Sequence, residues 1–228
     1  MEWTQISEQT VCVVPMYNEA QVVGSVLDSL KMRFPHILCV DDGSTDASAE
    51  IARARGVRVI THRLNIGQGA ALQTAFRIVA SEAQFRYLVT FDADGQHDPD
   101  DAVRMAIKLA NSSASIMFAT RFHQDAKSKI PIAKQIVLRT VVRYNKFATG
   151  VNLSDTHNGL RAIRAEALPL LQINHFGMAH ATEIVSRTLQ GKLEYLEAPA
   201  TINYTEYSMR KGQSIMNAFN ILLEHLWR

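Results

Sequence analysis

The chain has 228 residues, of which 47% are hydrophobic, and a formal net charge of +2 at pH 7. This length and composition suffice for one large core, and no linker, repeat or low-complexity tract interrupts the chain, so we expect a single domain over residues 1–228. The small net charge, without a basic run that carries aromatic residues, argues against a nucleic-acid partner.

Cellular context can be read from the cysteines and the N-terminus. Cys12 and Cys39 both lie in apolar runs without the spacing of metal ligands, which is typical of small core residues in a reducing cytosol. Residues 1–9 are polar, and no run of about twenty apolar residues occurs, so we expect neither a signal peptide nor a membrane span.

Apolar runs alternate with helical patterns along the first half of the chain. Strands are expected near 10–14, 36–40, 57–61, 86–91 and 115–119, and helices near 20–32, 47–55, 68–82 and 99–111. The alternation predicts an α/β fold with a mostly parallel, Rossmann-like sheet and helices on both faces. In the less regular second half we expect helices near 131–147, 165–171 and 179–190, and strands near 160–163 and 193–203.

Polar loops follow three of these strands, at the edge where open α/β sheets bind ligands. The first strand runs into Pro15-Met16-Tyr17-Asn18-Glu19, and the second into Asp41-Asp42-Gly43-Ser44-Thr45-Asp46. Carboxylates at such a strand end can accept hydrogen bonds from a base or a ribose. Asp46 is interpreted as a helix N-cap, and a simple turn remains an alternative for Tyr17 and Asn18.

The strand near 86–91 ends in Asp92-Ala93-Asp94-Gly95-Gln96-His97-Asp98-Pro99. Two hard oxygen donors so close together suit Mg²⁺ or Mn²⁺. Because pairs of carboxylates also occur by chance, a plain acidic loop is the alternative interpretation for Asp92 and Asp94. Asp98 is expected to cap the next helix, with Pro99 as its first residue.

With Asn65-Ile66-Gly67-Gln68-Gly69-Ala70, these segments resemble the ordered motifs of family 2 glycosyltransferases. They are most similar to the dolichyl-phosphate mannosyltransferase-like branch, whose members act on polyprenyl phosphates. The resemblance covers about residues 10–214. It implies the glycosyltransferase A fold, with a nucleotide-sugar-binding half over about 10–98 and an acceptor half over about 99–228.

The resemblance also implies roles for single residues. Asp94 is the expected direct ligand of Mg²⁺ or Mn²⁺, Asp92 faces the ribose or the metal, and Gln96 assists. Asp42 is the expected contact of the base of a UDP- or GDP-linked sugar. Donor-binding residues are expected at Pro15, Tyr17, Glu19, Val40, Asp42, Asp92, Ala93, Arg210 and Lys211. The Gly67-Gln68-Gly69 segment is interpreted mainly as a tight helix entrance packed against the sheet, because a lone glycine pattern is a weak phosphate-binding signal.

The acceptor determines the mechanism. A phosphate monoester is already charged at pH 7 and needs cations rather than a general base. Arg121, Arg161 and the Arg210-Lys211 pair are the candidates, and the segment from Asp155 to Arg161 resembles the acceptor motif of the branch. A hydroxyl acceptor would instead need a base, for which His180 and Glu183 are the candidates.

Two departures from the branch concern this acceptor half. Leu160 stands where an aromatic residue is usual, and Met209 and Ile215 stand where related enzymes have Arg and Lys. Arg210 and Lys211 are expected to supply the missing charge.

Membrane contact is expected from an amphipathic stretch over 214–228, with the helix near 131–147 as a second candidate. Docking of either helix on the core or on a neighbouring subunit remains an alternative, and homo-oligomerisation stays open.

The sequence thus predicts an inverting, metal-dependent transfer of one sugar from a nucleotide-sugar to a polyprenyl phosphate. The expected location is cytoplasmic, peripheral to the inner face of the membrane, with a membrane surface or a membrane-embedded partner. The alternatives are transfer to a glycan or protein hydroxyl, and a degenerate protein that only binds sugar nucleotides or acts as a scaffold.

Overall fold

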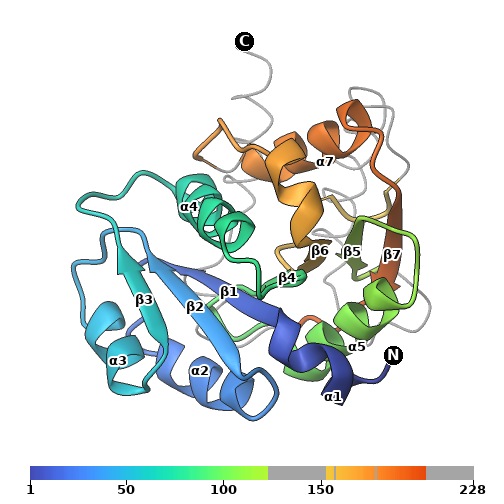
Figure 1. The fold of residues 1–228 in the computed structure, drawn as a ribbon. Coiled ribbons are helices and arrows are strands. Elements are labelled where there is room, and N and C mark those ends of the chain that lie inside the picture. Colours follow the sequence, from blue (N-terminus) through green and yellow to red (C-terminus); the bar gives the residue numbers. More distant parts are fainter. Residues whose placement is uncertain (123–152, 157, 178, 204–228) are drawn as a thin grey trace.

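The computed structural model of the chain describes residues 1–122, 153–156, 158–177 and 179–203 (Figure 1). The helix expected near 131–147, the amphipathic stretch over 214–228, Arg210 and Lys211 lie outside these residues.

A mixed sheet of seven strands forms the centre of the described fold, in the order β3-β2-β1-β4-β6-β5-β7 (Figure 1). Its strands are β1 (Thr10–Met16), β2 (His36–Asp41), β3 (Arg58–Thr61), β4 (Tyr87–Thr90), β5 (Ile116–Thr120), β6 (Arg161–Arg164) and β7 (Tyr195–Pro199). Strand β6 is antiparallel to both β4 and β5, and the other pairings are parallel. The predicted mostly parallel sheet is therefore confirmed.

Helices cover both faces of the sheet, as predicted. The described helices are α1 (Trp3–Ile6), η1 (Ser7–Gln9), α2 (Val23–Lys31), α3 (Ser48–Ala54), α4 (Gln68–Ser81), α5 (Pro99–Ala110), η2 (Ala165–Leu170) and α7 (His180–Gln190). Buried residues of α2, α3 and α5 pack on one face of the sheet, and those of α4, η2 and α7 pack on the other.

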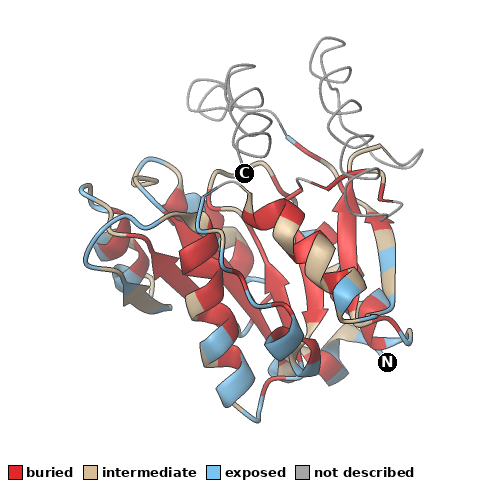
Figure 2. Cartoon of the chain, turned by 90° about the horizontal axis from the view of Figure 1, so that it is seen from above, coloured by how far each residue is buried: buried red, intermediate tan, exposed pale blue. Residues whose placement is uncertain are grey.

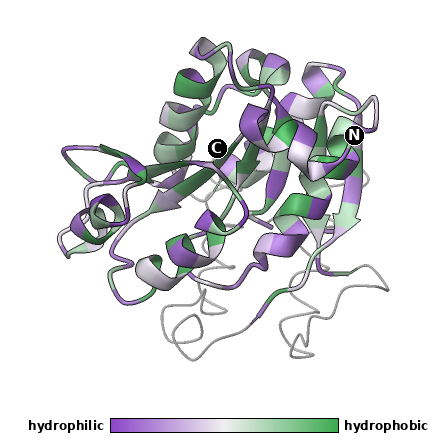
Figure 3. Cartoon of the chain, turned by 60° about the horizontal axis from the view of Figure 1, so that its bottom comes forward, coloured by the Kyte–Doolittle hydropathy of each residue, from purple (hydrophilic) through white to green (hydrophobic). Residues whose placement is uncertain are grey.

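The buried hydrophobic residues form two cores, one on each face of the sheet. Both contain residues of the same strands, because successive side chains of a strand point to opposite faces. In β1, Cys12 and Val14 point into the first core, and Val11 and Val13 point into the second. Because both faces are covered, the central strands are buried along their length (Figure 2). Hydrophobic residues accordingly concentrate on the strands, which are largely green in Figure 3, and on the helix positions that belong to the two cores.

Local sequence signals explain where some of the helices begin. Asp98 accepts a hydrogen bond from the backbone N–H of Asp100 at 2.8 Å and Pro99 is the first residue of α5, as predicted. The prediction of Asp46 as an N-cap is wrong, because Ala47 holds that position in α3. The Asp46 carboxylate instead accepts bonds from the backbone N–H groups of Ser48 (2.9 Å) and Ala20 (3.1 Å), so it links the loops after β1 and β2.

No helix within the described part of the chain is both long and apolar enough to cross a membrane.

Candidate active site

The polar loops meet at one edge of the sheet because β1, β2, β4 and β5 run in the same direction. The loops after β1 and β2 are joined there: the backbone N–H of Asn18 donates to Ser44 Oγ, and Asn18 Oδ1 accepts from the N–H of Thr45, both at 2.9 Å. Asn18 has a φ of 54°, which asparagine tolerates better than most residues. This turn leaves the neighbouring Tyr17 exposed at the edge, while Pro15 is buried at the end of β1.

Asp42, the expected base contact, holds the loop that precedes α4. Its carboxylate accepts hydrogen bonds from His62 Nδ1 at 2.8 Å and from the backbone N–H groups of Ile66 (3.1 Å) and Gly67 (2.6 Å). The base contact of Asp42 stays a prediction. The neighbouring Asp41, the other carboxylate that the sequence places at this strand end, has a buried oxygen, Oδ2, that has no hydrogen-bond partner.

The glycines of the α4 entrance pack against the loop before α7 rather than against the sheet, which corrects the prediction. Gly67 has a φ of 117°, and a Cβ there would lie 2.2 Å from the carbonyl oxygen of Phe176. Gly69 donates its N–H to the same oxygen at 2.9 Å. The start of α4 and the segment around Phe176 therefore touch through backbone at this point, where a side chain would separate them.

Asp92 follows β4 directly and is held on both carboxylate oxygens. Oδ1 accepts from Gln68 Nε2 at 3.0 Å, and Oδ2 accepts from His97 Nε2 at 3.1 Å. Burial alone would raise the pKa of Asp92, but the hydrogen bond and charge of His97, with the charge of Arg161, lower it below its usual value. Asp92 is thus an ionised carboxylate at neutral pH.

Asp94 lies in a contrasting environment. Its carboxylate accepts from the backbone N–H of Gln96 at 3.0 Å and from Gln96 Nε2 at 2.7 Å. Burial, and after it the negative charges of Asp92 and Glu19, raise the pKa of Asp94 to about 6, although the Gln96 hydrogen bond and the charge of His97 act in the opposite direction. The structure therefore brings the three predicted metal-binding residues, Asp92, Asp94 and Gln96, into one cluster.

The chemistry of this cluster suits a divalent cation, because crowded carboxylates with a raised pKa are stabilised by neutralisation. Within the described residues, no three His, Cys, Asp or Glu side chains form a group that could hold a metal ion. Water and diphosphate oxygens would therefore have to complete the coordination shell, as they commonly do for Mg²⁺.

Two predicted acceptor cations, Arg121 and Arg161, are gathered around Asp155. Arg121 follows β5 and donates from Nε to Asp155 Oδ2 at 2.6 Å, with side chains only 9% and 2% exposed. Arg161 opens β6 and is buried, close enough to Asp92 and Asp155 for their charges to act on it, although burial is the larger influence and lowers its pKa. A line of alternating charges thus leads from Asp92 through Arg161 and Asp155 to Arg121.

The two candidate bases, His180 and Glu183, lie in the first turn of α7. Glu183 Oε2 accepts from the backbone N–H groups of Asn174 and His175, both at 2.8 Å, and Oε1 accepts from Arg187 at 3.3 Å. His180 Nδ1 donates to the carbonyl oxygen of Gly177 at 2.8 Å, and burial followed by the charge of Arg161 lowers its pKa to about 4. Both side chains are thus engaged in holding the loop before α7.

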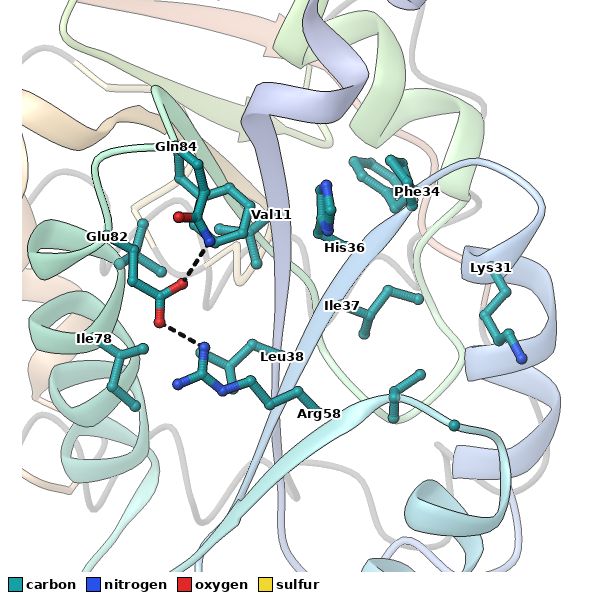
Figure 4. A pocket seen from close by; sticks show the side chains of 15 residues that line it. Val11, Lys31, Phe34, His36, Ile37, Leu38, Arg58, Ile78, Glu82 and Gln84 are labelled. Atoms are coloured by element: carbon teal, nitrogen blue, oxygen red, sulfur yellow. Dashed lines mark hydrogen bonds and ion pairs between the residues drawn. The ribbon is translucent and has the colours of Figure 1, made fainter.

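A pocket of about 380 Å³ lies at the opposite edge of the sheet, where β1 and β2 begin. Its lining is partly apolar, and Arg58 on its wall is paired with Glu82 at 2.6 Å (Figure 4). This pocket contains none of the predicted site residues.

A mostly parallel sheet with two carboxylates at the end of a central strand is the arrangement of glycosyltransferases of the A fold, and solved structures agree with this class. The chain superposes with a TM-score of 0.71 on glucosyl-3-phosphoglycerate synthase from Mycobacterium tuberculosis, crystallised with Mn²⁺ and uridine-diphosphate-glucose, at 16% identity. The match covers 99% of this chain and 81% of the other.

Residues 11–170 match the model of the family described as glycosyl transferase family 2, and the chain therefore belongs to this family. It is 29% identical to the UDP-N-acetylglucosamine–dolichyl-phosphate N-acetylglucosaminyltransferase of Methanococcus voltae, over 92% of this chain and 91% of the relative. It is 27% identical to the polyprenol monophosphomannose synthase of Mycolicibacterium smegmatis, over 93% of this chain and 84% of the relative. The chain is a glycosyltransferase.

Proposed function

We propose that this glycosyltransferase moves one sugar from a nucleotide-sugar to a polyprenyl phosphate, with inversion at the anomeric carbon and with a divalent cation. The observation that carries the proposal is the arrangement around Asp92. Asp92 lies close enough to the buried Arg161 for its positive charge to lower the pKa of the carboxyl. Glu183 is occupied by backbone N–H groups, and burial lowers the pKa of His180 to about 4, too low for an effective base at neutral pH. A site organised in this way suits a nucleophile that is already charged, such as a phosphate monoester.

In the proposed reaction, an acceptor phosphate oxygen attacks the anomeric carbon from the side opposite the nucleotide. A bond forms between that oxygen and the carbon as the bond to the leaving diphosphate breaks, and no proton has to be removed. Asp94, with Asp92 and Gln96, would hold Mg²⁺ or Mn²⁺, which when bound neutralises charge on the leaving diphosphate.

The donor nucleotide would occupy the loops after β1 and β2. Pro15, Tyr17, Glu19 and Val40 would line its pocket, and Ala93 would lie beside the sugar-bearing diphosphate. Of the two adjacent carboxylates, Asp41 has the unpartnered oxygen that could accept an N–H of the base, while Asp42 fixes the loop below it. Arg210 and Lys211 are proposed to contact the donor from the C-terminal segment, which begins after Asn203 beside Gln96.

The acceptor phosphate would approach from the side of Arg121. Arg161 is buried, so it would act on the site through its positive charge, close to Asp92, and would have little direct contact with the acceptor. Both sequence relatives named above carry a lipid phosphate or its product in their names, which supports a lipid-linked acceptor and hence a reaction at the membrane surface.

The experiment is a screen of UDP- and GDP-linked sugars with purified protein and a long-chain polyprenyl phosphate, in the presence of Mn²⁺, Mg²⁺ or EDTA. The proposal predicts a metal-dependent lipid product that carries one sugar through a phosphodiester. A metal-dependent product formed only on a glycan or protein hydroxyl would support the alternative function.

A further inference from the structure

Asp92 is held from three sides by residues that lie in different segments of the chain. Gln68 and His97 donate to its two carboxylate oxygens, and the backbone of Gly159 lies against the carboxylate. We refer to Gln68, His97 and Gly159 as the Asp92 clamp.

Gln68 reaches Asp92 because the start of α4 is fixed. The residue before it, Gly67, donates its N–H to Asp42 at 2.6 Å, and the residue after it, Gly69, donates to the carbonyl oxygen of Phe176 at 2.9 Å. The Gln68 amide is therefore presented to Asp92 by backbone on both sides, and Nε2 lies 3.0 Å from Oδ1.

His97 is buried, with a side chain only 3% exposed, and its ring packs edge-on against Phe91 with centroids 5.6 Å apart. Its backbone forms a bridge with Ile202. The other ring nitrogen, Nδ1, is buried and has no hydrogen-bond partner. Burying an imidazole with one unpaired nitrogen costs free energy of folding. The hydrogen bond from Nε2 to Asp92 is the polar interaction that explains why the ring lies here.

Gly159 completes the clamp by having no side chain. A Cβ at this position would lie 1.9 Å from Asp92 Oδ2, a distance that no real contact allows. The backbone cannot retreat easily, because the Gly159 carbonyl accepts from Thr90 Oγ1 at 2.6 Å and Thr90 belongs to β4.

We propose that Gln68, His97 and Gly159 are positioning residues that hold Asp92 in a single orientation, so that its remaining lone pairs and those of Asp94 face one cation. The inference rests on the proposed function only in taking these carboxylates as the cation site. Partners of metal-binding carboxylates typically contribute 10- to 100-fold in metal affinity.

The test is the Mn²⁺ affinity of the full chain, measured by electron paramagnetic resonance of free Mn²⁺ with no sugar nucleotide present. His97→Phe keeps a ring against Phe91 but removes the donor, and we expect it to weaken Mn²⁺ binding about 10-fold or more. His97→Gln restores an N–H at about the same reach and should recover much of that loss. His36→Phe makes the same chemical change at an exposed ring that contacts Glu8, and it should bind Mn²⁺ as the wild type does.

Gln68→Met supplies a second, independent variant, since the first residue of a helix tolerates a side chain without donors. We expect it to weaken Mn²⁺ binding in the same direction with an unchanged melting temperature, whereas a purely structural role would lower the melting temperature and leave the affinity alone. Unchanged Mn²⁺ affinity in both His97→Phe and Gln68→Met would overturn the clamp, and so would a wild-type chain that binds no Mn²⁺. A wild type that binds Mn²⁺ with this dependence yet transfers no sugar would retain the clamp and reject the proposed function.

Discussion

Two carboxylates that lie two residues apart have opposite electrostatic environments, and this contrast defines the site at the scale of single residues. Asp92 has donors on both oxygens and a lowered pKa, whereas Asp94 is half-buried beside other carboxylates and has a pKa of about 6. Asp94 is therefore the carboxylate with the most to gain from a bound cation.

Asp94→Asn should leave the fold intact and lower the rate of sugar transfer by about 100-fold or more, the scale of losing a principal electrostatic stabiliser. The measurement is kcat with Mn²⁺ and the preferred donor. Asp98→Asn is the matched control, because asparagine also caps helices and α5 should be preserved. Activity of Asp94→Asn equal to that of the control would remove Asp94 from the site.

At the scale of elements, the start of α7 is organised around backbone groups of the loop before it. Glu183 accepts from two consecutive N–H groups, and His180 donates to a carbonyl oxygen in the same loop. That loop also contacts the entrance of α4 through Phe176, so α7 and α4 are positioned together.

Glu183→Gln tests whether this carboxylate is structural or a base. A glutamine oxygen can still accept from the loop, so we expect a loss of about 1–2 kcal/mol in the free energy of unfolding and retention of most activity with a phosphate acceptor. A general base would instead cost about 10²–10⁴ in kcat. Chemical denaturation and steady-state kinetics of the same preparation distinguish the two, and a kinetic collapse in stably folded protein would favour the hydroxyl-acceptor mechanism.

His180 should make the folded state sensitive to acid. Because burial lowers its pKa to about 4 in the folded chain, the unfolded chain takes up a proton near pH 6.5 while the folded chain does not. Stability that is present above pH 6.5 is therefore lost as the pH falls toward 4, by about 3 kcal/mol.

His180→Asn keeps an N–H for the Gly177 carbonyl and removes the titration, so it should lose about 3 kcal/mol less than the wild type between pH 7 and pH 4. Urea unfolding of both proteins at the two pH values measures this difference. Parallel loss of stability in the two proteins would show that His180 is not the acid-sensitive group.

For the whole molecule, the sequence predicted the architecture better than the contacts within the site. Continuous apolar runs such as Val11–Val14 and the capped start of α5 are local signals, so strands and helices could be read directly. The antiparallel direction of β6 could not, because pairing is decided by the path of the chain between β5 and β6.

The site residues likewise divide into those that a local sequence pattern indicates and those that only the fold brings together. Asp92 and Asp94 follow one strand and were recognisable as a pair. Gln68 and Gly159 meet Asp92 only in the folded chain, and no local pattern indicates these contacts. His97 lies in the same loop as the carboxylates, so a search for buried donors beside the predicted metal ligands would have found it.

The most direct measurement is sugar transfer from the preferred nucleotide-sugar to a polyprenyl phosphate and to the matching polyprenol, side by side, with Mn²⁺ present or chelated. If a cation held by Asp92 and Asp94 assists attack by a charged phosphate, product should form on the phosphate, stop with EDTA, and be absent from the alcohol. Equal transfer to the alcohol, or undiminished transfer in EDTA, would contradict this mechanism.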